Sequence, residues 1–292
     1  MRRAGGYHRA VLTFDSVRKK YGQTVALDGL SLTCAAGEVL GLLGPNGAGK
    51  STAFAIAGGL RDADAGEVRV EGCAGVGAAK RKRWIGAAPQ RLAIYPELTG
   101  YENLLFFGRL FGVERRALKA RAGELLERVG LASRAGRRAK TYSGGMARRL
   151  NLAAALMHRP RIVLLDEPTA GVDPQSRAAI LDLVRETRDG GAAVLYTTHY
   201  IEEAQRLCDR VAVVDHGKLL ACGAVDQLIG AHSEESVVIV ETTGGVERRL
   251  VRDAISEVAT LLGRADVRGV RVERADLETV FLDLTGRSLR DA

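Results

Sequence analysis

Short runs of apolar residues that end at polar or glycine-rich segments are the clearest pattern in the first three-quarters of the chain. Three such runs occupy residues 38–43, 161–168 and 192–196. Runs of this kind are typical of strands that are buried on both faces of a parallel sheet. Residues 51–57, which follow the first run, are predicted to form a helix. The alternation of strands and helices predicts an α/β fold.

In the middle of the chain the apolar positions recur at the spacing of amphipathic helices. Thr99 and Glu102 have the spacing of a helix-capping box, and Gly130 stands where a second helix should stop. We therefore expect a helical lobe at about residues 91–160. The predicted apolar stripes of its two helices contain Tyr101, Leu104, Leu105 and Phe111, and Leu118, Leu125, Leu126 and Val129.

The pattern changes again near residue 226. A polar linker at 232–235 is followed by segments with strand character and by a short helix that begins at Asp276 and stops at Gly286. We expect a small C-terminal α+β domain over residues 226–292, separate from a main domain over residues 10–225. The three predicted strands cover residues 236–241, 246–251 and 267–272.

A glycine-rich loop joins the first buried strand to its helix. Strand, glycine loop and helix is the arrangement that binds phosphate, because backbone N–H groups and the helix N-terminus face the ligand. Lys50 would place a full positive charge near the terminal phosphates, and Ser51 would hold magnesium. The residues predicted to contact a nucleotide here are Gly44, Pro45, Asn46, Gly47, Ala48, Gly49, Lys50, Ser51 and Thr52.

Two further segments carry chemistry related to phosphate. Asp166 and Glu167 end a buried strand, and ligands bind at this end of the strands in open α/β sheets. Asp166 would face magnesium, and Glu167 would face the attacking water. Ser143, Gly144 and Gly145 open a second helix that also suits phosphate. Two such helix starts imply either one shared nucleotide or a nucleotide held by another copy of the chain.

Together these segments resemble the ATP-binding cassette (ABC) ATPases over roughly residues 10–225. The order of motifs matches that family from one end of this range to the other. The matching positions are Tyr21 as the adenine-stacking aromatic, residues 44–51 as the phosphate loop, Gln90 as the Q-loop, residues 142–146 as the signature, Asp166 and Glu167, Asp173 in the D-loop at 170–174, and the switch histidine His199.

The resemblance implies a P-loop NTPase (RecA-like) fold, with a mixed sheet, an antiparallel β subdomain and the inserted helical lobe. It implies ATP and Mg²⁺ as ligands, with Ser51, Gln90 and Asp166 at the metal. It also implies a head-to-tail homodimer, in which Lys50 of one chain and Ser143 of the other hold the same nucleotide. Hydrolysis would then dissolve the interface that ATP had completed.

Two of the predicted site residues could instead have a purely structural role. Tyr21 could be a surface aromatic on a turn, and His199 could be a core residue at a strand end. In the resembled family, the lobe surface beside the Q-loop receives a cytoplasmic helix of a membrane subunit. Phe106 and Phe107 could contribute to that surface or belong to the core.

The signature segment departs from the common Leu-Ser-Gly-Gly-Gln, because Tyr142 and Met146 replace its first and last residues. Loss of the glutamine would remove a polar contact across a dimer. Glu167 and His199 are both present, so an active ATPase is expected.

Residues 277–287 resemble the C-terminal end of ATPases from the daunorubicin-resistance type of ABC exporter. This indicates the ATP-binding subunit of a bacterial exporter of drugs, antibiotics or lipid-like substrates, at the cytoplasmic face of the membrane and with separate permease subunits. A soluble ABC ATPase that acts on DNA or ribosomes is the alternative, and an unrelated P-loop kinase or GTPase is disfavoured by the helix at Ser143.

Composition narrows the class of protein further. The chain has 292 residues with 46% hydrophobic content, which indicates a globular protein. No apolar stretch approaches 18 residues, and the first six residues lack the apolar core of a secretory signal. The four cysteines, Cys34, Cys73, Cys208 and Cys222, show no close pairing, so reduced thiols and no metal other than Mg²⁺ are expected.

The formal net charge of +8 raises the possibility of a nucleic-acid partner. The basic clusters at 80–83 and 134–138 are scattered, however, and few aromatic residues lie among them. A solvated surface, or one that faces an anionic membrane, is the better interpretation. No nucleic-acid partner is expected.

Overall fold

The computed structural model describes residues 10–72, 82–231, 236–274 and 276–286. The predictions for residues 1–6 and for the linker at 232–235 lie outside these residues, as do Cys73 and the first half of the cluster at 80–83. Among the helices of the described ranges, none has the length and apolar character needed to cross a bilayer.

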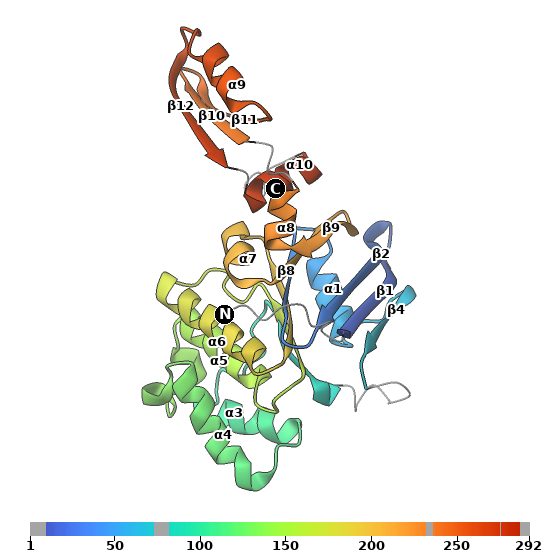
Figure 1. The fold of residues 1–292 in the computed structure, drawn as a ribbon. Coiled ribbons are helices and arrows are strands. Elements are labelled where there is room, and N and C mark those ends of the chain that lie inside the picture. Colours follow the sequence, from blue (N-terminus) through green and yellow to red (C-terminus); the bar gives the residue numbers. More distant parts are fainter. Residues whose placement is uncertain (1–9, 73–81, 232–235, 275, 287–292) are drawn as a thin grey trace.

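A six-stranded sheet forms the centre of the main domain, with the strand order β5-β6-β7-β3-β8-β9 (Figure 1). The first five strands are parallel, and β9 pairs antiparallel with β8. The expected buried strands are therefore confirmed, as β3, β6 and β7. The strands are β3 (Val39–Leu43), β5 (Ile85–Ala88), β6 (Ile162–Asp166), β7 (Ala193–Thr198), β8 (Arg210–Asp215) and β9 (Lys218–Ala224).

Successive residues of the buried strands contribute to two different cores, one on each face of the sheet. In β6, Val163 and Leu165 pack with the helices of one face, whereas Ile162 and Leu164 belong to the core that contains α1 (Lys50–Ala57). Strands buried on both faces have no need for polar residues at alternate positions, which explains their continuous apolar runs.

An antiparallel sheet covers α1 on the side away from the central sheet. Its strand order is β2-β1-β4, and Phe14, Leu30 and Phe54 join it to α1 in one core. The bounds are β1 (Ala10–Tyr21), β2 (Thr24–Ala35) and β4 (Ala65–Val70). The mixed sheet with an additional antiparallel sheet confirms the predicted fold class.

The helical lobe contains α3 (Gly100–Leu110) and α4 (Arg115–Arg128), followed by α5 (Gly144–Ala155). The capping box is confirmed, because the Glu102 backbone N–H donates to Thr99 Oγ1 and the Thr99 N–H donates to the Glu102 carboxylate. Of the two phenylalanines, Phe106 is exposed and Phe107 is partly buried against the core. Short 3₁₀ turns occur at η1 (Lys82–Trp84), η2 (Ala132–Arg134) and η3 (Ala139–Thr141).

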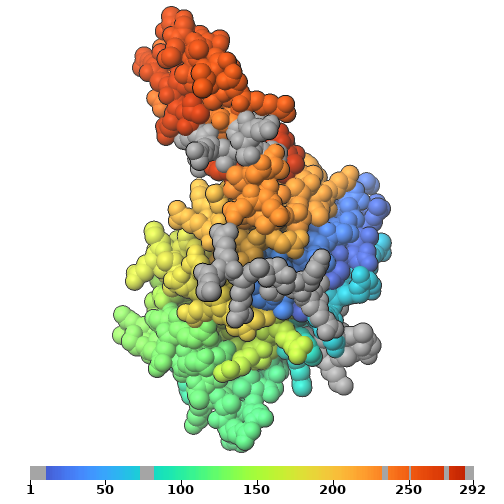
Figure 2. Space-filling view, in the orientation of Figure 1, coloured from blue at the N-terminus to red at the C-terminus, as the bar shows by residue number. Residues whose placement is uncertain are grey.

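The last part of the chain contains an antiparallel sheet of order β11-β10-β12 with α9 on one face. Val238, Val240 and Leu261 form its core. The three predicted strands are confirmed, but helix α9 was not predicted. The bounds are β10 (Ser236–Thr242), β11 (Gly245–Val251), α9 (Ala254–Leu261) and β12 (Val267–Arg274). Figure 2 shows this sheet unit projecting from one end of the molecule.

The final helix, α10 (Leu277–Thr285), packs its apolar face on the main domain, and its Glu278 also pairs with Arg248 of β11 at 2.9 Å. Its buried residues Leu277, Val280 and Phe281 join the core that includes α7 (Ile201–Leu207). Asp276 caps the helix and Gly286 ends it, as predicted, and Gly286 adopts the left-handed conformation. The remaining helices are α6 (Pro174–Asp189) and α8 (Val225–Gly230), and α8 also contacts α10. The expected C-terminal domain thus includes a helix whose apolar face packs elsewhere.

Candidate active site

The strand order brings the four predicted catalytic loops to one edge of the central sheet. In the parallel pairing, Leu43 lies opposite Thr198, and Asp166 lies opposite Thr197. The loop after β3, the carboxylates after β6 and the histidine after β7 therefore leave neighbouring strands at the same level. β5 is the next strand outward, and Gln90 follows it after one residue.

The phosphate loop depends on the absence of side chains at two glycines. Gly49 has φ of 104°, and a Cβ there would clash with the Ala26 carbonyl oxygen. A Cβ on Gly44 would clash with the Val214 carbonyl oxygen. Helix α1 begins at Lys50 with no side chain capping it, so backbone N–H groups at its start can bind an anion.

Lys50 lies at the centre of this loop. Its Nζ donates to the carbonyl oxygens of Gly44 (2.7 Å) and Pro45 (2.9 Å) and lies 3.6 Å from Glu167 Oε1. Burial lowers the pKa of Lys50, and the nearby carboxylates of Glu167 and Asp166 oppose that shift. A triphosphate would supply the buried ammonium with further negative partners.

Glu167 is the meeting point of the predicted catalytic side chains. Gln90 Nε2 donates to its Oε2 over 3.1 Å, and His199 Nδ1 lies 3.1 Å from its Oε1. The residue is buried, and its φ of 47° is unusual for a residue with a side chain. Strain of this kind is concentrated at functional sites. Three side chains from three different loops therefore fix this carboxylate.

Asp166 faces the other predicted magnesium ligand. Its Oδ1 accepts hydrogen bonds from Thr197 Oγ1 (2.6 Å) and Ser51 Oγ (3.3 Å). A hydroxyl and a carboxylate fit Mg²⁺, which commonly uses one or two protein oxygens together with substrate phosphates. Gln90, the third predicted metal ligand, instead bonds to Glu167 here.

The signature residues lie at the exposed start of α5. Ser143 caps the helix by accepting from the Met146 N–H over 3.3 Å. Gly145 lies against Asp173 and Ser176, and the Asp173 carboxylate in turn caps α6. Among the described residues, no hydrogen bond joins Ser143 to Lys50 or Glu167. The structure thus pairs the signature with the D-loop of the same chain.

Tyr21 stands at the end of β1, and 46% of its surface is exposed. It is paired with Thr24 across the turn into β2. Further along β2, Ala26 contacts Gly49 of the phosphate loop. The ring is therefore held on a hairpin beside the loop, where a role in adenine stacking stays a prediction.

Sequence reasoning missed two residues of the site. Arg148, on α5, donates through a guanidinium nitrogen to the Gln90 carbonyl oxygen, and Thr197 binds both Asp166 and the Glu167 N–H (3.0 Å). Thr197 lies just before Thr198 and His199, near the end of a buried strand. A hydroxyl at this position, beside the strand that ends in Asp166, could have been recognised from the sequence as a site residue. No sequence signal placed Arg148 against Gln90.

Tyr142, the first atypical residue of the signature, has a structural role. Its hydroxyl donates to the Arg134 carbonyl oxygen over 2.9 Å. Tyr142→Phe should lower the free energy of unfolding by about 1 kcal/mol, because one hydrogen bond is lost. Chemical denaturation would measure this change. The matched control is Tyr101→Phe, since the Tyr101 hydroxyl forms no hydrogen bond within the part of the chain that the structure describes. An equal loss of stability in both variants would contradict the assignment.

Comparison with known proteins agrees with this geometry. Residues 27–170 match the family model described as ABC transporter. The chain is 39% identical to the linearmycin resistance ATP-binding protein LnrL of Bacillus subtilis (strain 168), covering 96% of this chain and 100% of that protein. It is 40% identical to the daunorubicin resistance ATP-binding protein DrrA3 of Streptomyces coeruleorubidus, covering 96% and 97%.

Solved structures share the fold. A dimeric ATP-binding cassette in a post-hydrolysis state, bound to ADP and Pi, is 27% identical in sequence, with a TM-score of 0.66. The match covers 73% of this chain and 98% of that one. The residues predicted to bind phosphate here therefore sit in a fold that holds ADP in a related protein.

Proposed function

Because the chain belongs to the ABC transporter ATP-binding proteins, a family of ATPases, we propose that it powers an exporter whose membrane-spanning subunits are separate chains. The observation that carries this proposal is the meeting of Lys50, Gln90 and His199 on the Glu167 carboxylate. The relatives named for linearmycin and daunorubicin resistance support export of drugs, antibiotics or lipid-like substrates.

The side chains divide the work of hydrolysis. Lys50 and the N–H groups at the start of α1 bind the phosphates. Glu167 orients the attacking water and accepts its proton, while His199 and Gln90 hold the carboxylate in place and report whether the γ-phosphate is present. Ser51 and Asp166 would hold Mg²⁺, which would supply positive charge beside the phosphates.

The exposed signature supports a site that is completed by a second copy. Among the described residues, Ser143 bonds to the helix that it caps and not to Lys50 or Glu167, and a helix N-terminus of this kind is suited to bind phosphate. We therefore expect a head-to-tail homodimer with two nucleotides at the interface. The dimeric cassette among the solved structures is consistent with this arrangement.

An apolar groove beside the Q-loop supports docking of a membrane subunit at the cytoplasmic face of a bacterial membrane. Its volume is about 140 Å³, and it is lined by residues of the lobe, of β5 and of the segment after α1, including Leu60, Ala93, Phe107 and Phe111. A helix of the partner packed here would contact the loop that carries Gln90.

Affinity purification of the full chain from detergent-solubilised membranes tests this proposal. We expect an integral membrane protein to be recovered with the chain, and recovery to fall when Phe107 is replaced by Ser. Leu110→Ser is the matched control, because Leu110 is exposed on the same helix but does not line the groove. Recovery of ribosomes or DNA in place of a membrane protein would favour a soluble ABC ATPase.

A further inference from the structure

A buried carboxylate outside the active site connects three elements that meet there. Glu203, on α7, is 4% exposed. Its Oε2 accepts hydrogen bonds from Thr169 (2.7 Å), Tyr196 (2.8 Å) and Thr198 (3.4 Å). Thr169 lies two residues after Glu167, and Thr198 precedes His199. One side chain of α7 thus ties the loop that follows β6 to strand β7.

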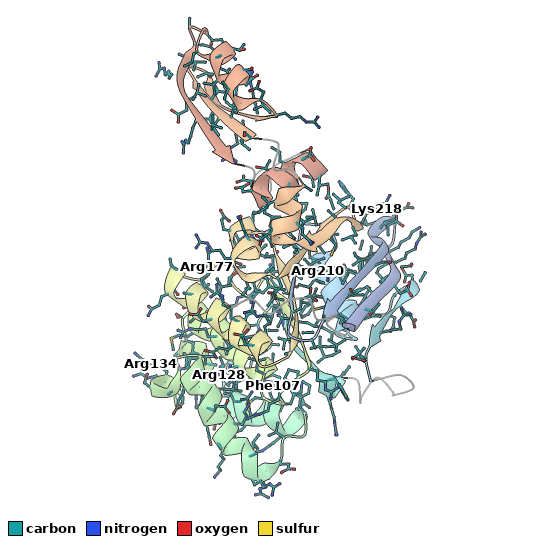
Figure 3. All side chains as sticks on the ribbon, viewed as in Figure 1. Phe107, Arg128, Arg134, Arg177, Arg210 and Lys218 are labelled. Atoms are coloured by element: carbon teal, nitrogen blue, oxygen red, sulfur yellow. The ribbon has the colours of Figure 1, made fainter. Side chains whose placement is uncertain are left out.

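Arg177 brings the start of α6 into the same cluster (Figure 3). Its Nε lies 3.3 Å from the other oxygen of Glu203, Oε1. Its guanidinium carbon lies 5.1 Å from the centre of the Tyr200 ring, within the range of a cation–π contact. Arg177 stands one helical turn after Asp173, which caps α6 and lies against the signature residue Gly145.

The ring of Tyr200 continues the chain of contacts to the active site. It packs against the His199 imidazole, with 4.1 Å between the ring centres and 40° between the ring planes. His199 Nδ1 then faces Glu167 Oε1 at 3.1 Å. An unbroken path of side-chain contacts therefore leads from the beginning of α6 to the catalytic carboxylate.

We infer that Arg177 and Tyr200 are positioning residues that couple the start of α6 to His199, with Glu203 as the fixed anchor of the coupling. This inference rests on the proposed function. A partner chain that binds beside the signature and Asp173 would move the first turn of α6. That movement would reach the imidazole through Arg177 and Tyr200, so the site would be aligned for hydrolysis only when the partner is in place.

The test replaces Arg177 by Met in the full chain and measures steady-state hydrolysis of MgATP. We expect kcat to fall about ten-fold, because His199 loses its fixed orientation, while KM changes by less than about two-fold. Arg185→Met is the matched control. Arg185 lies on the same helix, its side chain is 38% exposed against 39% for Arg177, and it pairs with Asp182 at 2.7 Å.

A second variant distinguishes coupling from a general loss of packing. Tyr200→Leu should lower kcat to the same extent, and the Arg177→Met, Tyr200→Leu double variant should be no slower than either single variant. A double variant that loses about a hundred-fold would mean independent effects and would overturn the inference. If Arg177→Met does not fold, Tyr200→Leu alone tests the inference, and an unchanged kcat of Tyr200→Leu would overturn the inferred coupling.

The outcomes also separate this inference from the proposal on which it depends. A wild-type chain that hydrolyses no ATP would overturn both. An active wild type, together with Arg177→Met as fast as Arg185→Met, would overturn only the coupling through α6.

Discussion

Glu167→Gln is expected to abolish steady-state ATP hydrolysis, with a loss of at least about a thousand-fold in kcat. The amide keeps the size of the side chain but cannot accept the proton of the attacking water. It also presents an NH₂ group to one of the neighbours that now face the carboxylate, Lys50, Gln90 and His199. Release of phosphate from purified protein measures the effect.

The same variant should trap the proposed dimer in the presence of MgATP. Moving a closure equilibrium from 1:99 to 99:1 requires about 5.5 kcal/mol of differential binding. Two nucleotides, each forming charge-assisted bonds to Ser143 of the opposite chain only in the closed state, could supply this energy. Light scattering should therefore report a dimer with ATP and a monomer without it.

Glu114→Gln provides the control, because Glu114 is an exposed residue that pairs only with a surface arginine in the described residues. It should hydrolyse ATP at the wild-type rate. A Glu167→Gln protein that binds MgATP but stays strictly monomeric would argue against the shared nucleotide site.

Lys50→Ala and Ser143→Arg should separate binding from hydrolysis. Without Lys50 the phosphates lose a buried ammonium, and we expect MgATP affinity to fall by at least about a hundred-fold, or roughly 3 kcal/mol. Ser143→Arg should leave the affinity of the monomer within about two-fold, yet reduce hydrolysis to background. Titration with a fluorescent ATP analogue and a phosphate-release assay measure the two quantities.

The reasoning depends on where the two residues stand. Lys50 is buried within the phosphate loop of its own chain. Ser143 is exposed, and among the described residues its side chain bonds only to the helix that it caps. Lys140→Ala serves as the control for a charge change near the signature, since Lys140 pairs with Glu97 on the surface. Equal loss of MgATP affinity in Lys50→Ala and Ser143→Arg would refute the proposal that Lys50 binds the nucleotide in the monomer and Ser143 acts only in hydrolysis.

Much of this site was predictable because its residues follow short, fully buried strands. Such strands are recognised in the sequence by their continuous runs of apolar residues, and parallel pairing places their carboxyl ends at one edge of the sheet. The alignment of Asp166 with Thr197 in the sheet is an example, since each closes an apolar run. Local signals also sufficed for the capping box at Thr99 and for the left-handed end at Gly286.

Contacts between distant segments were not predictable from pattern alone. The apolar stripe of α10 was recognised, but a stripe does not identify its partner, and Phe281 packs on the main domain. Glu203 illustrates the same limit. Its hydroxyl donors come from the loop after β6 and from β7, and only the folded structure brings these groups together. Helix α9 spans only eight residues, and periodicity alone does not distinguish so short a segment from a strand or a loop.

The position of α10 determines how the sheet unit is connected to the main domain and how it can be deleted. The chain leaves the main domain after α8, builds β10 to β12, and comes back as α10, which contacts α8. The sheet unit is therefore connected at both ends to helices that pack on the main domain, and not through a single linker. Truncating the chain after α8 would remove Phe281 from the core of the main domain. Deleting only the sheet unit and joining α8 to α10 through a short linker would keep Phe281 in that core.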